Sequence, residues 1–369
     1  RGFDLIFGRT YNVQDKYLGP LGFGGTHVYN IFVTNFQDGT IHIKWPDGHT
    51  EIFTENVDGT YQSPTGVFSP LTDSDIGGFE LTTKGKTIFR FAAGSGRLTE
   101  VEDRKGNKLT LTYDDKGRLE KAEGLTGNYL TFQYEGTDPL KISSVTDKTN
   151  RRASFGYTNE DLTRFTDTRG NAYQYIYDSQ HRLTEITDPL NQRVLRNTYD
   201  AYARVTEQRD GLNRLTTLNY DPAQIGRVTV TDPLNQTLTQ VYDNQFRITE
   251  SGDPAGNTMT YQYNNDNLRT LVTDRENTSA NATYDANGNM LSIIDAMGQV
   301  TSFTYNENHE ATKITLPGGH ERNFEYDAEG NLTRVQETVD GTNIGTQYGY
   351  NEWGQLTSVI DPNNRTTIY

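Results

Sequence analysis

The residues best placed to do chemistry in this sequence are twelve tyrosines that recur at a nearly constant interval. Adjacent members lie 20 to 24 residues apart, and a turn-forming residue follows each of them. A row of tyrosines could bind sugars by stacking, or it could pack a repeated fold. Packing is the favoured interpretation, because a periodic aromatic residue usually lies in a core. The twelve are Tyr113, Tyr134, Tyr157, Tyr177, Tyr199, Tyr220, Tyr242, Tyr263, Tyr284, Tyr305, Tyr326 and Tyr350.

Histidines give little support for a metal or a catalytic triad. The six histidines form neither a His-x-x-x-His nor a His-Glu-x-x-His arrangement. His42 and His49 bracket an expected hairpin and could approach each other, although a metal pair there is the less favoured interpretation. His181 replaces the glycine of a repeat turn, so we expect it to be an exposed turn residue.

The recurring aspartates could bind calcium, which favours clustered oxygen ligands. The run Asp73-Ser74-Asp75-Ile76-Gly77 is a fragment of such a loop, but it lacks the later bidentate glutamate. Turn capping explains these carboxylates without a metal and is the favoured interpretation. Residues 94–96 are too short for a phosphate loop, and no lysine follows them. The sequence therefore predicts no catalytic residue, no cofactor and no metal site.

The elements that position the tyrosines are β-hairpins. Apolar residues alternate before each tyrosine, as in Leu109, Leu111 and Tyr113, which is typical of a strand with one buried face. A turn follows, then a second strand with an apolar residue six positions after the tyrosine, where a bulge could change the face it meets. A second turn of the Asp-Pro type closes the unit. Short connections force antiparallel neighbours, so the array predicts an all-β antiparallel strip that twists into a spiral.

Composition restricts the function further. The chain has 369 residues, a hydrophobic fraction of 33%, 23 Tyr and 16 Phe, too many aromatics for a disordered chain. The net charge of -15 argues against a nucleic-acid groove or an anionic membrane surface as partner. No apolar run approaches the roughly 18 residues of a membrane helix, and we find no signal peptide. We read the chain, which begins with Arg1, as an excised fragment; with no cysteine it has no disulfide or thiolate site.

Two regions are expected. Residues 1–100 lack the tyrosine period but read as short strands between Gly-rich turns, with an unusual Gly-rich segment at 19–27. We expect this region to be a β-rich cap that closes one end of the strip. Residues 101–369 form the array of about twelve repeats, and no linker separates the two regions.

The repeat unit resembles a known family. Tyr-Asp-x-x-Gly-Arg-Leu, present at 113–119, and Asp-Pro-x-Gly-Asn, present at 253–257, resemble the YD repeat of Rhs proteins, a family that also includes Tc toxin C subunits, wall-associated toxins and teneurins. The segments 9–12 and 19–22 are similar to the domain that precedes the repeats in bacterial Rhs proteins. One departure is Gly25, where many relatives have tryptophan.

The resemblance implies a hollow β-cocoon that encloses a toxic C-terminal domain until delivery. The leading hypothesis is therefore a non-catalytic shell fragment, secreted or at the cell surface, whose partners are its own toxin domain and the delivery machinery. The family's self-cleavage aspartates and the toxin domain are not in this sequence. The rival hypothesis is an extracellular adhesion module that binds glycans or proteins, and an enzyme has little support. Exposed edge strands would let the fragment self-associate.

Overall fold

The computed structural model describes residues 3–75, 77–135, 140–222, 226–339 and 342–369, which form strands and turns and no helix. No helix that could cross a membrane occurs among them. The N-terminal strands form small sheets. They are β1 (Arg9–Tyr11) with β4 (Gly25–His27), β2 (Leu18–Gly19) with β3 (Gly22–Phe23), and β5 (Phe32–Asn35), β6 (Thr40–Lys44), β7 (Thr50–Glu55) and β8 (Tyr61–Gln62) in one sheet.

One long antiparallel sheet contains all later strands, each paired with the next along the chain. Its strands are β9 (Leu71–Asp73), β10 (Phe79–Thr82), β11 (Ile88–Phe91), β12 (Leu98–Glu102), β13 (Lys108–Tyr113), β14 (Leu119–Gly124), β15 (Tyr129–Tyr134), β16 (Ile142–Asp147), β17 (Arg152–Thr158), β18 (Asp161–Thr166), β19 (Ala172–Tyr177), β20 (Leu183–Thr187), β21 (Arg193–Tyr199), β22 (Val205–Asp210), β23 (Leu215–Tyr220), β24 (Arg227–Thr231), β25 (Thr237–Tyr242), β26 (Ile248–Gly252), β27 (Thr258–Tyr263), β28 (Arg269–Thr273), β29 (Ser279–Tyr284), β30 (Met290–Ile294), β31 (Val300–Tyr305), β32 (Ala311–Thr315), β33 (Glu321–Tyr326), β34 (Leu332–Val339), β35 (Thr342–Tyr350), β36 (Leu356–Ile360) and β37 (Thr366–Ile368).

The repeat tyrosines lie at or next to the ends of the odd-numbered strands from β13 to β35. In the first unit Thr112 pairs with Lys121 but Tyr113 pairs with Leu119, so Glu120 is the extra residue of a β-bulge. The bulge leaves Leu119 on the same face as Tyr113, because directly paired residues share a face. A register shift occurs at the tyrosine in most other units as well.

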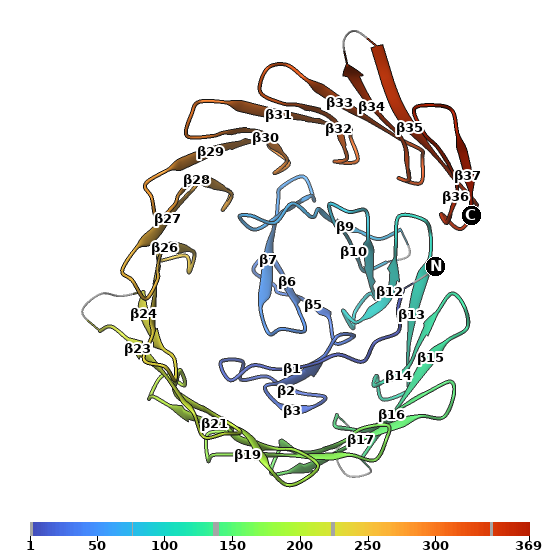
Figure 1. The fold of residues 1–369 in the computed structure, drawn as a ribbon. Helices are drawn as coiled ribbons and strands as arrows, with labels where there is room; N and C mark the ends of the chain where they lie inside the picture. Colours follow the sequence, from blue (N-terminus) through green and yellow to red (C-terminus); the bar gives the residue numbers. More distant parts are fainter. Residues whose placement is uncertain (1–2, 76, 136–139, 223–225, 340–341) are drawn as a thin grey trace.

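The strip coils into an open spiral. Viewed along the coil, the strands labelled β1, β5 and β7 lie inside the ring that the later hairpins form (Figure 1). β9 pairs with β10 and β37 pairs with β36, and in the described ranges no register joins β37 to β9. The predicted antiparallel strip with an N-terminal β-rich cap is therefore confirmed. The predicted boundary near residue 100 falls inside β12, where the sheet is continuous, so the division into two regions stays a prediction.

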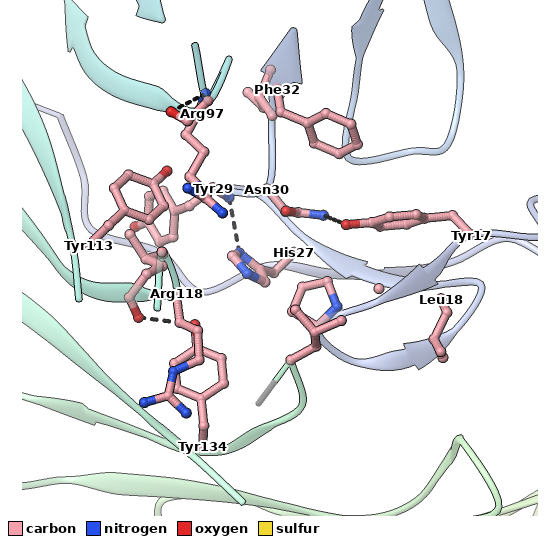
Figure 2. A pocket seen from close by; sticks show the side chains of 17 residues that line it. Tyr17, Leu18, His27, Tyr29, Asn30, Phe32, Arg97, Tyr113, Arg118 and Tyr134 are labelled. Carbon is pink, nitrogen blue, oxygen red and sulfur yellow. Dashed lines mark hydrogen bonds between the residues drawn. The ribbon is translucent and has the colours of Figure 1, made fainter. Parts of the chain in front are cut away.

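The buried core lies where the N-terminal strands pack on the first hairpins. Ile41, Ile43 and Phe53 are completely buried, and Phe132 and Phe155 of the strip belong to the same cluster. Between the N-terminal strands and the first tyrosine hairpins, beside Tyr113, Arg118 and Tyr134, there is a pocket of about 300 Å³ (Figure 2).

Candidate functional site: the tyrosine rim and the inner face

The turns after the repeat tyrosines all lie along one edge of the strip, which we call the tyrosine rim. They lie together because the connections of an antiparallel meander alternate between its two edges. Among the described residues, the rim turns are 114–117, 159–160, 178–181, 200–203, 243–246, 264–267, 285–288, 306–309, 327–330 and 351–354.

The repeat tyrosines join each hairpin to the one before it. The Tyr113 hydroxyl donates a hydrogen bond of 2.7 Å to the carbonyl oxygen of Leu98, and the Tyr263 hydroxyl donates one of 2.8 Å to that of Ile248. Tyr134, Tyr157, Tyr199, Tyr220, Tyr284, Tyr326 and Tyr350 make the equivalent bond. Tyr242 instead donates to the side-chain oxygen of Gln240. These contacts support an architectural role for the tyrosines, which stays our interpretation.

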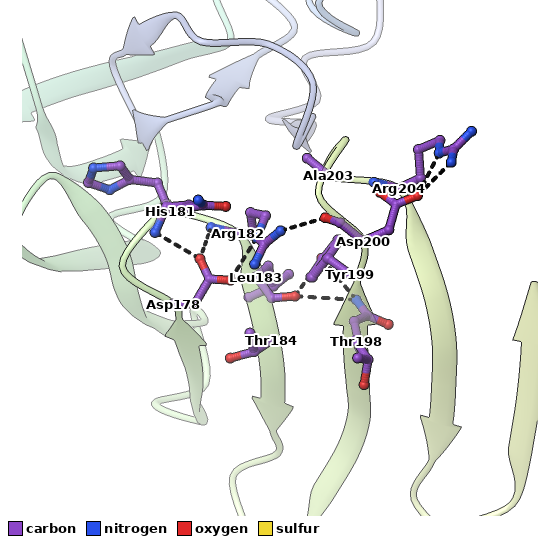
Figure 3. A network of polar contacts seen from close by, with 12 residues as sticks. Asp178, His181, Arg182, Leu183, Thr184, Thr198, Tyr199, Asp200, Ala203 and Arg204 are labelled. Atoms are coloured by element: carbon purple, nitrogen blue, oxygen red, sulfur yellow. Dashed lines mark hydrogen bonds and ion pairs between the residues drawn. The ribbon is translucent and has the colours of Figure 1, made fainter.

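The aspartate of the motif caps the turn and holds an arginine. Asp178 Oδ1 accepts from the backbone N–H groups of Gln180 at 2.9 Å and Arg182 at 3.1 Å (Figure 3). Arg182 Nε donates to Asp178 Oδ2 at 2.7 Å, and Nη1 donates to the carbonyl oxygen of Asp200 in the next turn at 2.9 Å. The same guanidinium lies 5.1 Å from the centre of the Tyr199 ring, a cation–π contact. The arginine therefore links two adjacent units, whereas the aspartate closes its own turn.

This bonding determines the protonation of the rim. Burial alone would raise the pKa of Asp178, but the hydrogen bonds from Arg182 and Gln180 lower it below its usual value. Burial raises the pKa of the Tyr113, Tyr134 and Tyr177 hydroxyls. At neutral pH these three tyrosines are therefore neutral, and Asp178 is an ionised acceptor already engaged in its turn. In the described part of the chain no group of three acidic or histidine side chains could hold a metal ion.

The N-terminal region is bonded to the tyrosine rim. The Tyr11 hydroxyl donates to the carbonyl oxygen of His181 at 2.8 Å and accepts from the N–H of Leu183 at 3.1 Å. Gln14 Nε2 donates to the carbonyl oxygen of Ala203 at 2.9 Å. The N–H of Phe23 donates to the carbonyl oxygen of Glu160 at 2.9 Å. The rim turns therefore rest on the region that the sequence predicts as a cap.

Further along the rim, the turns meet the first strands of the strip itself. The turn at 103–106 lies on the opposite edge, because it precedes β13. Arg104 forms an ion pair with Glu310 and donates to the carbonyl oxygen of Ala328 at 3.3 Å. Lys105 Nζ donates to Asn331 Oδ1 at 2.5 Å. We call these contacts the coil seam, since they join residues more than 200 positions apart.

The inner face of the strip is most deeply buried at its first hairpins. The residue two before each repeat tyrosine faces inward, and we call this set the inner row. Its first members, Leu111, Phe132 and Phe155, are buried, and the Phe7 ring packs 5.8 Å from both phenylalanine rings. Later members, including Tyr261, Phe303 and Phe324, are only half-buried. None of the inner row after Phe155 belongs to the core cluster of the described residues.

The structure places the predicted histidines in separate surroundings. His42 packs against Phe36 and contacts Thr40, whereas His49 stacks on Trp45 and pairs with Asp47 at 2.5 Å. The buried His27 has its pKa lowered to about 3 because burial disfavours the charged ring.

The expectation of an exposed His181 is wrong. Its φ of 62° fits the glycine position of the turn, but the ring stacks on Phe23 at 4.4 Å and Nδ1 lies 3.0 Å from Asp161 Oδ1. Contact with the N-terminal region leaves its side chain 31% exposed. The residues around His181 in the sequence do not indicate its contacts with Phe23 and Asp161.

Two other sequence features have local explanations. Asp73 of the suggested calcium fragment accepts a hydrogen bond from the Tyr61 hydroxyl at 2.9 Å, and Ile76 of that fragment lies outside the described residues. Gly25 is buried against the N-terminal backbone, where an added Cβ would lie 2.3 Å from the carbonyl oxygen of Leu21. A larger residue at this position would require the main chain to move.

Comparison with known proteins agrees with this architecture. The Teneurin YD-shell family model matches residues 80–212 and 210–342, and the RHS Repeat model matches residues 326–366. The tRNA nuclease WapA of Bacillus subtilis is 37% identical over 185 residues, half of this chain and 8% of the relative. The tRNA3(Ser)-specific nuclease WapA of Bacillus spizizenii is 37% identical over 116 residues, 31% of this chain and 5% of the relative.

Solved structures share the fold. The Photorhabdus luminescens Tc holotoxin pore aligns with a TM-score of 0.54 and 14% identity, over 87% of this chain and 21% of that one. A TcdB2-TccC3 crystal structure aligns with a TM-score of 0.53 and 14% identity, over 87% and 22%. The chain thus spans less than a tenth of the curated relatives above and about a fifth of these structures. Since the YD-shell model matches more than half of it, the chain belongs to the Rhs/YD-repeat shell family.

Proposed function

We propose that this chain is a wall segment of a hollow shell whose inner face shelters a polypeptide cargo. The observation that carries the proposal is the inner row, which is buried in the first hairpins and half-buried afterwards. The row is mostly apolar, although it includes Asn197 and Gln240, and the described residues leave its later part half-buried. A partner would cover it further, because large apolar surfaces in water favour association. Burial alternates along the strand, since Phe303 is half-buried and its neighbour Thr304 is exposed. This alternation supports a wall with one inner and one outer face.

A toxin is the cargo that we infer. Two WapA relatives carry nuclease names, and the structures that share the fold come from Tc toxins. We assign the chain itself a shell role without catalysis, because its recurring aspartates and tyrosines are engaged in the turns and in bonds between hairpins. Its partners would be the toxin domain of the same protein and the delivery machinery, and its location would be secreted or at the cell surface.

Cysteine labelling tests this proposal, because the chain contains no cysteine. Phe303→Cys puts a thiol on the inner face, and Thr304→Cys puts a matched thiol on the outer face of the same strand. In the isolated chain both should react with a maleimide. In the full-length protein, with any other cysteines replaced, we expect position 303 to be protected and position 304 to react as before. Equal labelling of both positions in the full-length protein would reject the shell.

One observation favours the rival function, an adhesion module for glycans or proteins. Tyr202, Phe246 and Trp353 are 75%, 88% and 57% exposed on the tyrosine rim. Exposed aromatic side chains are common at binding surfaces. Binding on a glycan array that is lost in Phe246→Ala and Trp353→Ala, with unchanged folding, would favour this second candidate.

A further inference from the structure

Arg97 occupies the position of a repeat arginine without its carboxylate partner. Like Arg118, it follows a glycine with positive φ. It also precedes the leucine whose carbonyl oxygen accepts a hydrogen bond from the next repeat tyrosine. The N–H of Ala92 donates to the carbonyl oxygen of Arg97 at 2.8 Å, just as Asp114 does to Arg118 at 2.9 Å. Ala92 therefore stands where the motif has aspartate.

Four other arginines of this position are neutralised. Arg118, Arg182, Arg204 and Arg247 pair with the aspartate four residues earlier at 2.7 to 2.8 Å. Arg97 lies 5.6 Å from the centre of the Tyr113 ring, and in the described ranges it forms no ion pair. A guanidinium keeps its charge, so this position holds an unpaired cation.

The guanidinium lines the pocket of about 300 Å³ described above (Figure 2). The volume is at the low end of that of small-molecule sites. Its walls include the rings of Tyr17, Phe32, Tyr113 and Tyr134. Arg118 also lines the pocket, but Asp114 balances its charge. The pocket therefore combines one unbalanced positive charge, that of Arg97, with aromatic walls.

One hydroxyl adds a donor to this wall. The Tyr17 hydroxyl accepts from Asn30 Nδ2 at 3.3 Å, which leaves its own hydrogen free to donate. Burial raises the pKa of Tyr17, so it remains a protonated donor at neutral pH.

We propose that this pocket binds a carboxylate carried on an aromatic or apolar body. A guanidinium recognises a carboxylate through two parallel hydrogen bonds, and the hydroxyl of Tyr17 supplies a further donor. The aromatic walls accommodate the apolar part of the ligand. A free aromatic acid and the carboxyl end of a polypeptide offer the same chemistry. This inference is independent of the proposed shell function.

Isothermal titration of the chain with phenylacetate tests the site. We expect saturable binding to the wild-type chain and at least tenfold weaker binding of the neutral isostere phenylacetamide. Arg97→Gln should weaken phenylacetate binding by a similar factor. Arg204→Gln is the matched control, since Arg204 has the same repeat position but pairs with Asp200 away from the pocket. It should leave the affinity unchanged.

Ala92→Asp is the sharper variant, because it places a carboxylate at the position of the motif aspartate, in a turn one residue longer than the turn of Asp114 and Arg118. We expect it to fold with unchanged or higher thermal stability and to lose phenylacetate binding. N-acetylphenylalanine distinguishes the two kinds of ligand. Tighter binding than phenylacetate indicates the carboxyl end of a polypeptide, and weaker binding indicates a free aromatic acid. No saturable binding of either acid to the wild-type chain, or equal binding to Arg97→Gln, would overturn the proposal.

Discussion

Tyr199 makes two contacts that a phenylalanine or a leucine could not make together. Its hydroxyl donates to the carbonyl oxygen of Leu183 in the preceding hairpin, and its ring receives the guanidinium of Arg182 from that hairpin. The same two contacts are made by Tyr113, Tyr134, Tyr220 and Tyr263. The sequence predicted the packing of these tyrosines but not the hydroxyl bond, because the acceptor is a backbone carbonyl and leaves no trace in residue type.

The hydroxyl bond should be measurable in one strand. Tyr263→Phe removes the donor to Ile248, and we expect a loss of about 0.5–1.5 kcal/mol in the free energy of unfolding by urea. Tyr261→Phe in the same strand is the control, since that hydroxyl contacts only the Met259 sulfur at 3.8 Å. Equal losses in the two variants would contradict the assigned role of the hydroxyl.

Because of the turn aspartates, the free energy of unfolding should depend on pH in the acid range. Hydrogen bonds from the Thr149 hydroxyl and from the N–H and guanidinium of Arg151 lower the pKa of Asp147 to about 2. The folded-state pKa is depressed, so the stabilisation is complete above the unfolded pKa of about 3.9 and is lost as pH falls through about 2. Carboxyl titration by NMR should show this pKa in the wild type and a higher one in Thr149→Val. An unshifted carboxyl in the wild type would contradict the capping account.

At the scale of the element, much of the hairpin was predictable. Strand alternation, the turn residues and the aspartate caps act over fewer than ten residues, so the sequence around Tyr113 indicates them directly. Arg97 shows a signal that was present but missed, since comparing 92–98 with 114–119 reveals the absent aspartate. The partners of His181 and Arg104 could not be predicted, because they depend on the accumulated twist of the strip.

The fourth turn position should prefer glycine even where the sequence has another residue. Phe246 has a φ of 61° and is 88% exposed, so Phe246→Gly relieves left-handed strain and loses little packing. We expect a gain of about 1 kcal/mol in unfolding free energy. Gly256→Ala is the mirror control, because φ there is 86° and an added Cβ meets nothing within 4 Å. It should destabilise by a similar amount, and a change of the same sign in both variants would refute the argument.

At the scale of the whole molecule, the coil is held by contacts between its first strands and strands one coil later. Arg104 and Glu310 carry part of this seam, and their side chains are 20% and 15% exposed. Arg104→Gln should cost about 1.5–3 kcal/mol at the seam, as expected for a hydrogen bond between charged groups.

Hydrogen exchange should show which strands lose stability in Arg104→Gln. Faster exchange is expected in β32 to β35, with β21 to β24 unchanged as the internal control. Arg204→Gln is the matched variant, because its ion pair lies within one hairpin turn. If Arg104→Gln leaves exchange in β32 to β35 unchanged, the seam does not hold the coil.

Trypsin cleavage of the proposed toxin domain shows whether the inner face of the shell shelters a polypeptide. The measurement compares the cleavage rate of the proposed toxin domain inside the full-length protein with the rate for the same domain expressed alone. We predict cleavage at least tenfold slower within the full-length protein, and the difference should disappear once the shell is unfolded. Equal rates in the native full-length protein and the free domain would contradict the account.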